Sequence, residues 1–398
     1  MASNIKKSSS NRKNLKELIR HFTPNWFTMV MGTGILFLMI GAFPYHFPGQ
    51  KHLAITLGII NVFLLAIFSI MFASRLIFFF KDARRLLDHP IQSMYLGAIP
   101  MGLATIVNGM VIFGPGLIGS FAVPTALILW YVDVIFSIVS GWLVPFYMFT
   151  SQKHSVERMT AVWLLPIVPS EVAAASAGFL AKSLPPVEAQ KVIYLGYILW
   201  ALSMPLAMSI LVILFLRLVW HKLPHQDMAV SSWLTLGPIG TGSLSIMLLG
   251  VDSVRAFMGT QWEQVAITAS HLGVIFGLLI WGYGMWWLIM AIFMTLTYIK
   301  EGLPFNMGWW GFTFPLGVFT AATIELYNLT SNLAFKITGS IFVLMLAMFW
   351  IIVTVQTLKG SWSMKLFNAP CLSEETGLPE PSASGICLIE TERESDRY

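Results

Sequence analysis

The stretch GWWGFTFPLGVFTAATIELY, residues 308–327, combines two properties that seldom occur together. It is apolar enough to lie in a lipid bilayer, yet it carries Gly311, Pro315 and Gly317 near its middle and Glu325 one or two turns further on. Proline removes an intrahelical hydrogen bond, and an ionised carboxylate in hydrocarbon costs at least about 2.5–3.5 kcal/mol. A helix that only anchored the protein would need neither feature. The stretch therefore predicts a membrane helix with a further function.

The composition of the whole chain agrees with a membrane location. Of its 398 residues, 56% are hydrophobic and 11% are charged, and the mean hydropathy is +0.74. Soluble domains carry about 25% charged residues, so the sequence predicts an all-α integral membrane protein. No P-loop, dinucleotide fingerprint or nucleophile elbow occurs, and the two cysteines have no metal-ligand spacing. We therefore expect no enzyme, no cofactor, no metal site and no nucleic-acid partner.

Apolar runs of about 20 residues, the length that crosses a bilayer, divide the chain into spans. Ten such runs are predicted, at 24–43, 53–80, 91–114, 121–150, 159–181, 192–220, 229–250, 264–298, 307–329 and 334–358. Lysine and arginine are concentrated in the loops on one side of this partition, together with both termini, and this side is expected to be cytoplasmic. The predicted organisation is a basic cytoplasmic tail (1–23), a ten-helix transporter domain (24–358) and a disordered acidic cytoplasmic tail (359–398). A plasma or inner membrane is assumed.

Helix-breaking residues recur in alternate spans. The five odd-numbered spans carry them as pairs, namely Gly32 and Gly34, Pro100 and Gly102, Pro166 and Pro169, Pro238 and Gly240, and Pro315 and Gly317. A carbonyl freed by proline must face protein or a water-filled cavity when it lies in a membrane. The pattern predicts five helical hairpins in a pseudo-five-fold arrangement, with the broken helices kinked around a central pore. Close helix packing through small residues is the alternative explanation.

Charged residues are rare in the spans. The broken spans have no lysine or arginine at their centres, so a pathway for anions would rely on backbone N–H groups and helix dipoles. Three acids lie within spans: Asp133, Glu171 and Glu325. We expect Asp133 to pair with a neighbouring helix. Glu171 and Glu325 are the candidate sites of proton coupling.

Several motifs together resemble one family. HFTPNWFTMVMGTGI (21–35), IPMGLATIVN (99–108), LGPIGTGS (236–243) and GWWGFTFPLG (308–317) are similar to segments of the tellurite-resistance/dicarboxylate transporter family. This family includes fungal malate and sulfite transporters and is related to the plant slow anion channel. The resemblance implies ten helices around a pore, a homotrimer with one pore per subunit, and a gating phenylalanine at the position of Phe314. It also matches Glu325 to a residue of the transporter-type members.

The function expected from these observations is secondary transport of a small anion across a lipid membrane. The anion is a C4-dicarboxylate such as malate, or sulfite, and transport is expected to be coupled to protons. A passive gated channel for nitrate or chloride on the same fold is the alternative.

Overall fold

A computed structural model describes residues 15–363, 366–367 and 369–372. These residues form helices and connecting loops and contain no β-strand. Within them, eight helical segments are long and apolar enough to cross a membrane, and these are Pro24–Gly41, Gln50–Phe78, Gln92–Ile112, Pro115–Thr150, Pro186–His221, Gln226–Phe257, Glu263–Glu301 and Leu333–Trp362. The prediction of an all-α integral membrane protein is confirmed.

The other two predicted spans have a different form. The region 159–181 contains a short 3-10 helix, η4 (Ala161–Leu164), and the 13-residue helix α8 (Pro169–Ala181). The region 307–329 contains η6 (Met307–Phe312) and the 17-residue helix α12 (Phe314–Thr330). Each is interrupted where the sequence carries proline, so neither forms a single helix of membrane-spanning length.

Among the described residues, five helices form the interior of the molecule. They are α2 (Phe27–Gly41), α5 (Ala98–Ile112), α8, α10 (Leu236–Phe257) and α12. Most of their side chains are buried. They contact one another in the closed order α2, α5, α8, α10, α12 and back to α2. We call them the inner helices.

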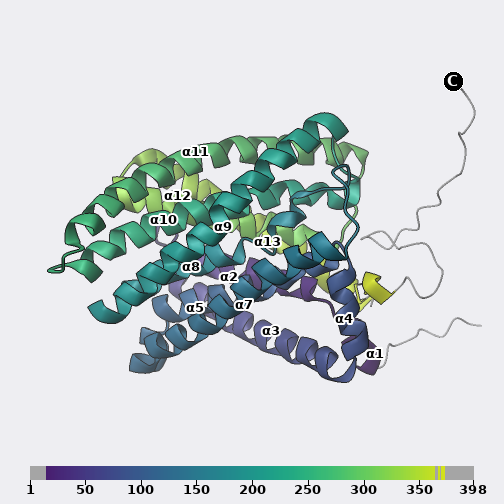
Figure 1. Cartoon of the computed structure of the whole chain (residues 1–398), viewed down its shortest axis with the longest axis horizontal. Coiled ribbons are helices and arrows are strands. Elements are labelled where there is room, and N and C mark those ends of the chain that lie inside the picture. The colour runs from purple at the N-terminus through teal and green to yellow at the C-terminus, as the bar shows by residue number, and fades with distance from the viewer. Residues whose placement is uncertain (1–14, 364–365, 368, 373–398) are drawn as a thin grey trace, which may run out of the picture.

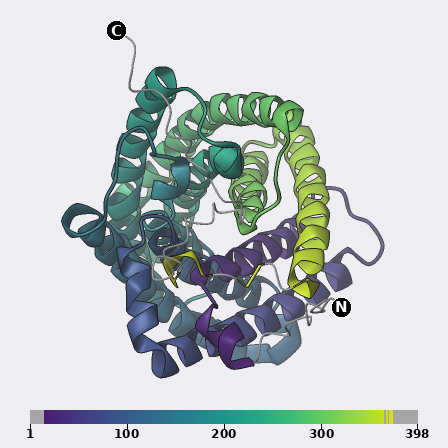
Figure 2. The same cartoon turned by 90° about the vertical axis from the view of Figure 1, so that its right-hand side faces the viewer.

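Each inner helix packs against the long helix that follows it in the chain. These outer helices are α3 (Gln50–Phe78), α7 (Ala122–Thr150), α9 (Pro186–His221), α11 (Glu263–Glu301) and α13 (Leu333–Trp362). Seen end-on, α3, α11 and α13 lie at the periphery around α2 (Figure 2). In the apolar part of Pro24–Gly41, 83% of the residues are buried, against 17% in α3 and in α11.

A 3-10 segment precedes every inner helix. These segments are η1 (Pro24–Trp26), η2 (Gln92–Gly97), η4, η5 (Gln226–Thr235) and η6. The prolines of the sequence pattern lie at these junctions. Pro169 and Pro315 occupy the first or second position of their helices, and Pro100 and Pro238 the third. The first four N–H groups of a helix have no intrahelical acceptor, so proline removes no hydrogen bond there.

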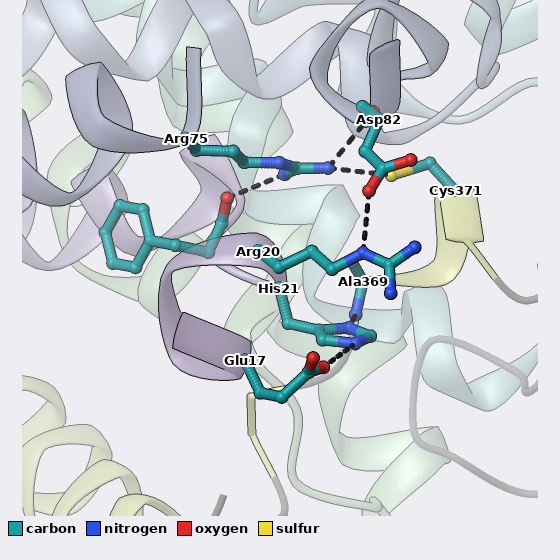
Figure 3. A network of polar contacts seen from close by, with 8 residues as sticks. Glu17, Arg20, His21, Arg75, Asp82, Ala369 and Cys371 are labelled. Carbon is teal, nitrogen blue, oxygen red and sulfur yellow. Dashed lines mark hydrogen bonds and ion pairs between the residues drawn. The ribbon is translucent and has the colours of Figure 1, made fainter. Parts of the chain in front are cut away.

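The remaining helices are short. The loop after α5 contains α6 (Pro115–Ile118) and η3 (Gly119–Phe121). Helices α1 (Leu15–Arg20) and α4 (Phe80–Asp88) lie side by side at one end of the molecule (Figure 1). Arg20 of α1 forms an ion pair with Asp82 of α4, with 2.6 Å between Nε and Oδ2. The buried Arg75 of α3 donates a hydrogen bond to the carbonyl oxygen of Phe22 at 2.6 Å (Figure 3).

Part of the predicted C-terminal tail is packed against this end. Helix α13 continues to Trp362, and the ring of Phe367 stacks on Trp26 with centroids 4.7 Å apart. The backbone N–H of Ala369 donates to His21 Nδ1, and Cys371 is buried beside Arg75 (Figure 3). Trp26 in turn stacks on Phe22, which packs beside Phe68. Residues 1–14 and 373–398 lie outside the described part of the chain.

Candidate functional site

A cavity lies among the inner helices. Every inner helix contributes side chains to it. Its polar lining residues are Thr105, Asn108, Thr241, Glu325 and Asn328, and no lysine or arginine lines it within the described residues. On α12 the lining extends from Phe314 to Asn328, which is about 20 Å at the rise of an α-helix. The cavity therefore follows the axis of the helix ring.

A second hollow, with about 510 Å³ of empty space, lies among the 3-10 segments. Its lining includes one residue or more from each of them, for example Asn25, Gln92, Val162, Asp227 and Met307. The two hollows share no lining residue. Phe314 follows η6 after one residue and lines the axial cavity at its start, so this ring lies on the side of the cavity nearest the 3-10 segments.

Two phenylalanines of the opening stretch point in different directions. Phe314 lines the cavity and is 3% exposed. Phe312 instead packs among aromatic rings, with its centroid 5.4 Å from Trp233 and 5.0 Å from Phe349 of the outer helix α13. A change at Phe314 alters the cavity, whereas a change at Phe312 alters the packing between inner and outer elements.

The glycines of the sequence pattern lie where inner elements meet. A Cβ atom at Gly240 would stand 2.5 Å from the backbone nitrogen of Phe319 in α12. The other glycines of the pattern face similarly close neighbours: Gly34 faces Thr105, Gly102 faces Val30, Gly317 faces Ile35, and Gly32 faces Thr313. All five lie within regular helix. Small residues permit this approach of helix axes, while the prolines mark helix starts and Pro166 lies in the turn before α8.

Glu171 is fully buried behind the wall of the cavity. Its Oε1 accepts a hydrogen bond from the hydroxyl of Thr241 at 2.8 Å, and Thr241 itself lines the cavity. Its Oε2 has no hydrogen-bond partner among the described residues. This carboxyl group is thus one side chain away from the cavity.

Glu325 lines the cavity at the end opposite Phe314. Its Oε2 accepts a hydrogen bond from the side-chain amide of Asn328 at 3.1 Å. Charged neighbours at this end include Asp252 of α10 and Lys182, which caps α8. Asp252 was not among the acids predicted to lie within spans, because the predicted span ended at 250, whereas α10 continues to Phe257.

Two other results differ from the expectations. Asp133 on α7 is fully buried and away from the cavity lining, but neither carboxylate oxygen has a hydrogen-bond partner among the described residues. The expected pairing with a neighbouring helix is therefore absent there. Thr105 and Asn108 line the cavity although the sequence analysis did not select them. The two polar residues are three positions apart in an otherwise apolar segment, so they share one face of a helix, but the sequence does not show that this face lines a cavity.

The site has no grouping suited to a metal. Within the described residues, no cluster of three or more histidine, cysteine, aspartate or glutamate side chains could hold a metal ion. A ring of apolar helices around an axial, weakly polar cavity is the architecture of a membrane channel or transporter.

The comparisons with known proteins agree with this class. The voltage-dependent anion channel family (SLAC1) matches residues 21–358, and the chain belongs to this family. The resemblance noted in the sequence is thereby confirmed, and the protein belongs to a family of transporters and anion channels, not of enzymes.

Three relatives are similar to this chain over most of its length. A sulfite efflux pump of Arthroderma otae is 38% identical over 355 residues, which cover 88% of this chain and 93% of that protein. An uncharacterised transporter of Methanocaldococcus jannaschii is 28% identical, with coverage of 88% and 97%. The malic acid transport protein of Schizosaccharomyces pombe is 24% identical, with coverage of 85% and 78%.

Proposed function

We propose that this protein transports a small anion across a membrane, and that the anion is sulfite. The observation that carries the choice of anion is the 38% identity to a sulfite efflux pump over 93% of that protein. The malic acid transport protein, at 24% identity, supports malate as the second candidate.

The pathway we propose follows the axial cavity. Residues 24–358 would form the transporter domain, with ten membrane-crossing segments in five hairpins and pseudo-five-fold symmetry. The closed order of contacts among the inner helices and the outer partner of each support this arrangement. Helix α8 alone measures about 20 Å, shorter than the roughly 30 Å hydrocarbon core, so it would cross together with η4. The termini would be cytoplasmic because lysine and arginine are concentrated on their side.

We also propose a gate, two proton-coupling residues and an oligomeric state. Phe314 would be the gate, since its ring lines the cavity at the end nearest the 3-10 segments. Glu325, which lines the cavity, and Glu171, which bonds to Thr241 in its wall, would carry coupling protons. A homotrimer embedded in lipid is supported by the resemblance and by the large apolar side chains exposed on the outer helices.

A flux assay in proteoliposomes tests this function. Purified protein is reconstituted, and uptake of labelled sulfite, malate, nitrate and chloride is measured with and without an imposed pH gradient. We expect sulfite flux above that of empty vesicles and an increase when the gradient is applied. Malate flux without sulfite flux would reassign the substrate. Equal flux of all four anions, indifferent to pH, would identify a passive channel instead.

A further inference from the structure

Most polar side chains in the axial cavity are already engaged in hydrogen bonds. The hydroxyl of Thr105 donates to the carbonyl of Gly102 at 2.7 Å and accepts from the side-chain amide of Asn61 at 3.1 Å. The Thr241 hydroxyl lies between the carboxylate of Glu171 and the carbonyl of Gly237. Glu325 and Asn328 bond to each other at the end of the cavity. None of these groups has a free hydrogen-bond donor in the middle of the cavity.

Asn108 is different. Its side chain lines the cavity and is 8% exposed. Its Oδ1 is enclosed and has no hydrogen-bond partner among the described residues, whereas its Nδ2 is not among the enclosed atoms and donates to no described residue. A primary amide offers two N–H donors on this nitrogen. The part of Asn108 that remains accessible from the cavity is therefore the donor group.

The position of Asn108 along the axis follows from contacts between helices. Gly34 meets Thr105, and the next residue of α2, Ile35, meets Gly317. Thr105 therefore lies near the level of Gly317. Asn108 lies about one helical turn further along α5. This places its amide between the level of Phe314 and the level of Glu325.

We propose that Asn108 binds the transported anion within the cavity and determines its selectivity for oxyanions. This inference rests on the proposed function and adds the residue that contacts the substrate. No cationic side chain of the described residues lines this cavity. A neutral amide donor there holds an anion weakly enough to release it, as throughput requires. Sulfite oxygens are strong acceptors for such a donor. Without the donor, an anion would enter according to its dehydration cost alone, which favours weakly hydrated anions.

The test compares three variants reconstituted in proteoliposomes. Asn108→Leu keeps the approximate size and removes the donor, and Asn108→Asp keeps the shape and replaces the donor by a negative charge. Thr268→Val is the control, since Thr268 lies exposed on the outer helix α11, away from the cavity lining, and its hydroxyl donates within its own helix to the carbonyl of Gln264. Sulfite flux is measured over a range of concentrations, and thiocyanate serves as the weakly hydrated competitor. Size-exclusion chromatography in detergent establishes that each variant is folded.

We expect Asn108→Leu to raise the KM for sulfite by about tenfold or more, the equivalent of one hydrogen bond to a charged partner. The ratio of thiocyanate flux to sulfite flux should rise with it. Asn108→Asp should abolish sulfite flux, while Thr268→Val should leave the KM within about threefold, because it changes no group that faces the cavity. If Asn108→Leu does not fold, Asn108→Ser, which keeps a shorter donor, should retain selectivity for sulfite at a raised KM.

The inference is overturned if folded Asn108→Leu has the KM and the selectivity of wild type. It is also overturned if Asn108→Ser lowers the flux of sulfite and the flux of thiocyanate equally. Failure of the proposed function gives a different result. If wild type carries malate and not sulfite, the substrate assignment fails, and the same variants measured with malate decide the role of Asn108. If wild type carries no anion, both proposals fail.

Discussion

The inner and outer helices differ in how they use proline and glycine, although both are apolar. Inner helices begin after a 3-10 segment and meet one another at glycine, and all of them except α2 carry proline in the first turn. Outer helices extend for 29–39 residues. Two of them, α7 and α9, also have a first-turn proline, but each contains an internal proline as well, Pro145 and Pro205, without ending there. Among these ten helices, an internal proline therefore occurs only in the outer set. In this protein the breaking residues shape the region around the cavity, and the long helices surround it.

The largest expected effect concerns a contact between inner helices. Gly240→Leu should prevent folding or greatly lower thermal stability, because the added side chain meets the backbone of Phe319, which has no freedom to move aside. Overpacking of this kind costs at least about 1–3 kcal/mol. Gly282→Leu on the outer helix α11 is the control, since a Cβ there has no neighbour within 4 Å. Melting curves in detergent measure both. Equal losses of thermal stability in the two variants would show that the inner helix is packed no more closely at Gly240 than the outer helix is at Gly282.

The next effect concerns the ring at the end of the cavity. Phe314→Ala should increase anion conductance in planar bilayers and lower its selectivity, because the ring narrows a weakly polar pathway and excludes water. Phe312→Ala should leave the conductance unchanged. It should instead lower the stability by about 3–5 kcal/mol through lost packing on Trp233 and Phe349. If folded Phe314→Ala conducts no more than wild type, the gate lies elsewhere.

The third prediction compares an acidic residue of an inner helix with an acidic residue of an outer helix in proton coupling. Glu325→Gln should abolish the uptake that a pH gradient drives and preserve exchange of anion for anion, since the neutral amide cannot carry a proton through the cycle. Asp133→Asn, on the outer helix α7 and away from the cavity lining, should preserve the pH-driven uptake. The measurement is labelled-anion flux in proteoliposomes with and without the gradient. Normal pH-driven uptake by Glu325→Gln would exclude this residue from coupling.

The smallest effect is expected for the prolines themselves. Pro315→Ala should change stability by less than about 1 kcal/mol, because the N–H it introduces lies in the first turn of α12, where no intrahelical acceptor is required. Pro205 lies inside α9, and Pro205→Ala should stabilise the helix by restoring a hydrogen bond. Thermal unfolding in detergent compares the two. A large loss in Pro315→Ala would show that the junction between η6 and α12 depends on the fixed proline backbone.

Several properties of this protein follow from the sequence alone. The membrane class, the helical structure and the paired proline and glycine residues of alternate spans are local properties, determined by hydrophobic length and by the chemistry of single residues. The family motifs were also recognisable as short segments. Phe314 was selected through the family resemblance and the adjacent proline, and Glu325 because it is a carboxylate within an apolar span. Both line one cavity.

Other properties were decided by the tertiary structure. Inner helices are buried on every side, so their apolar pattern has no period that shows which face lines the cavity. For this reason Asn108 and Thr105 were not selected, and the different directions of Phe312 and Phe314 became visible only through their neighbours. The bond between Thr241 and Glu171 joins residues 70 positions apart. Such contacts arise when the ring of helices closes, and no local property of the chain determines them.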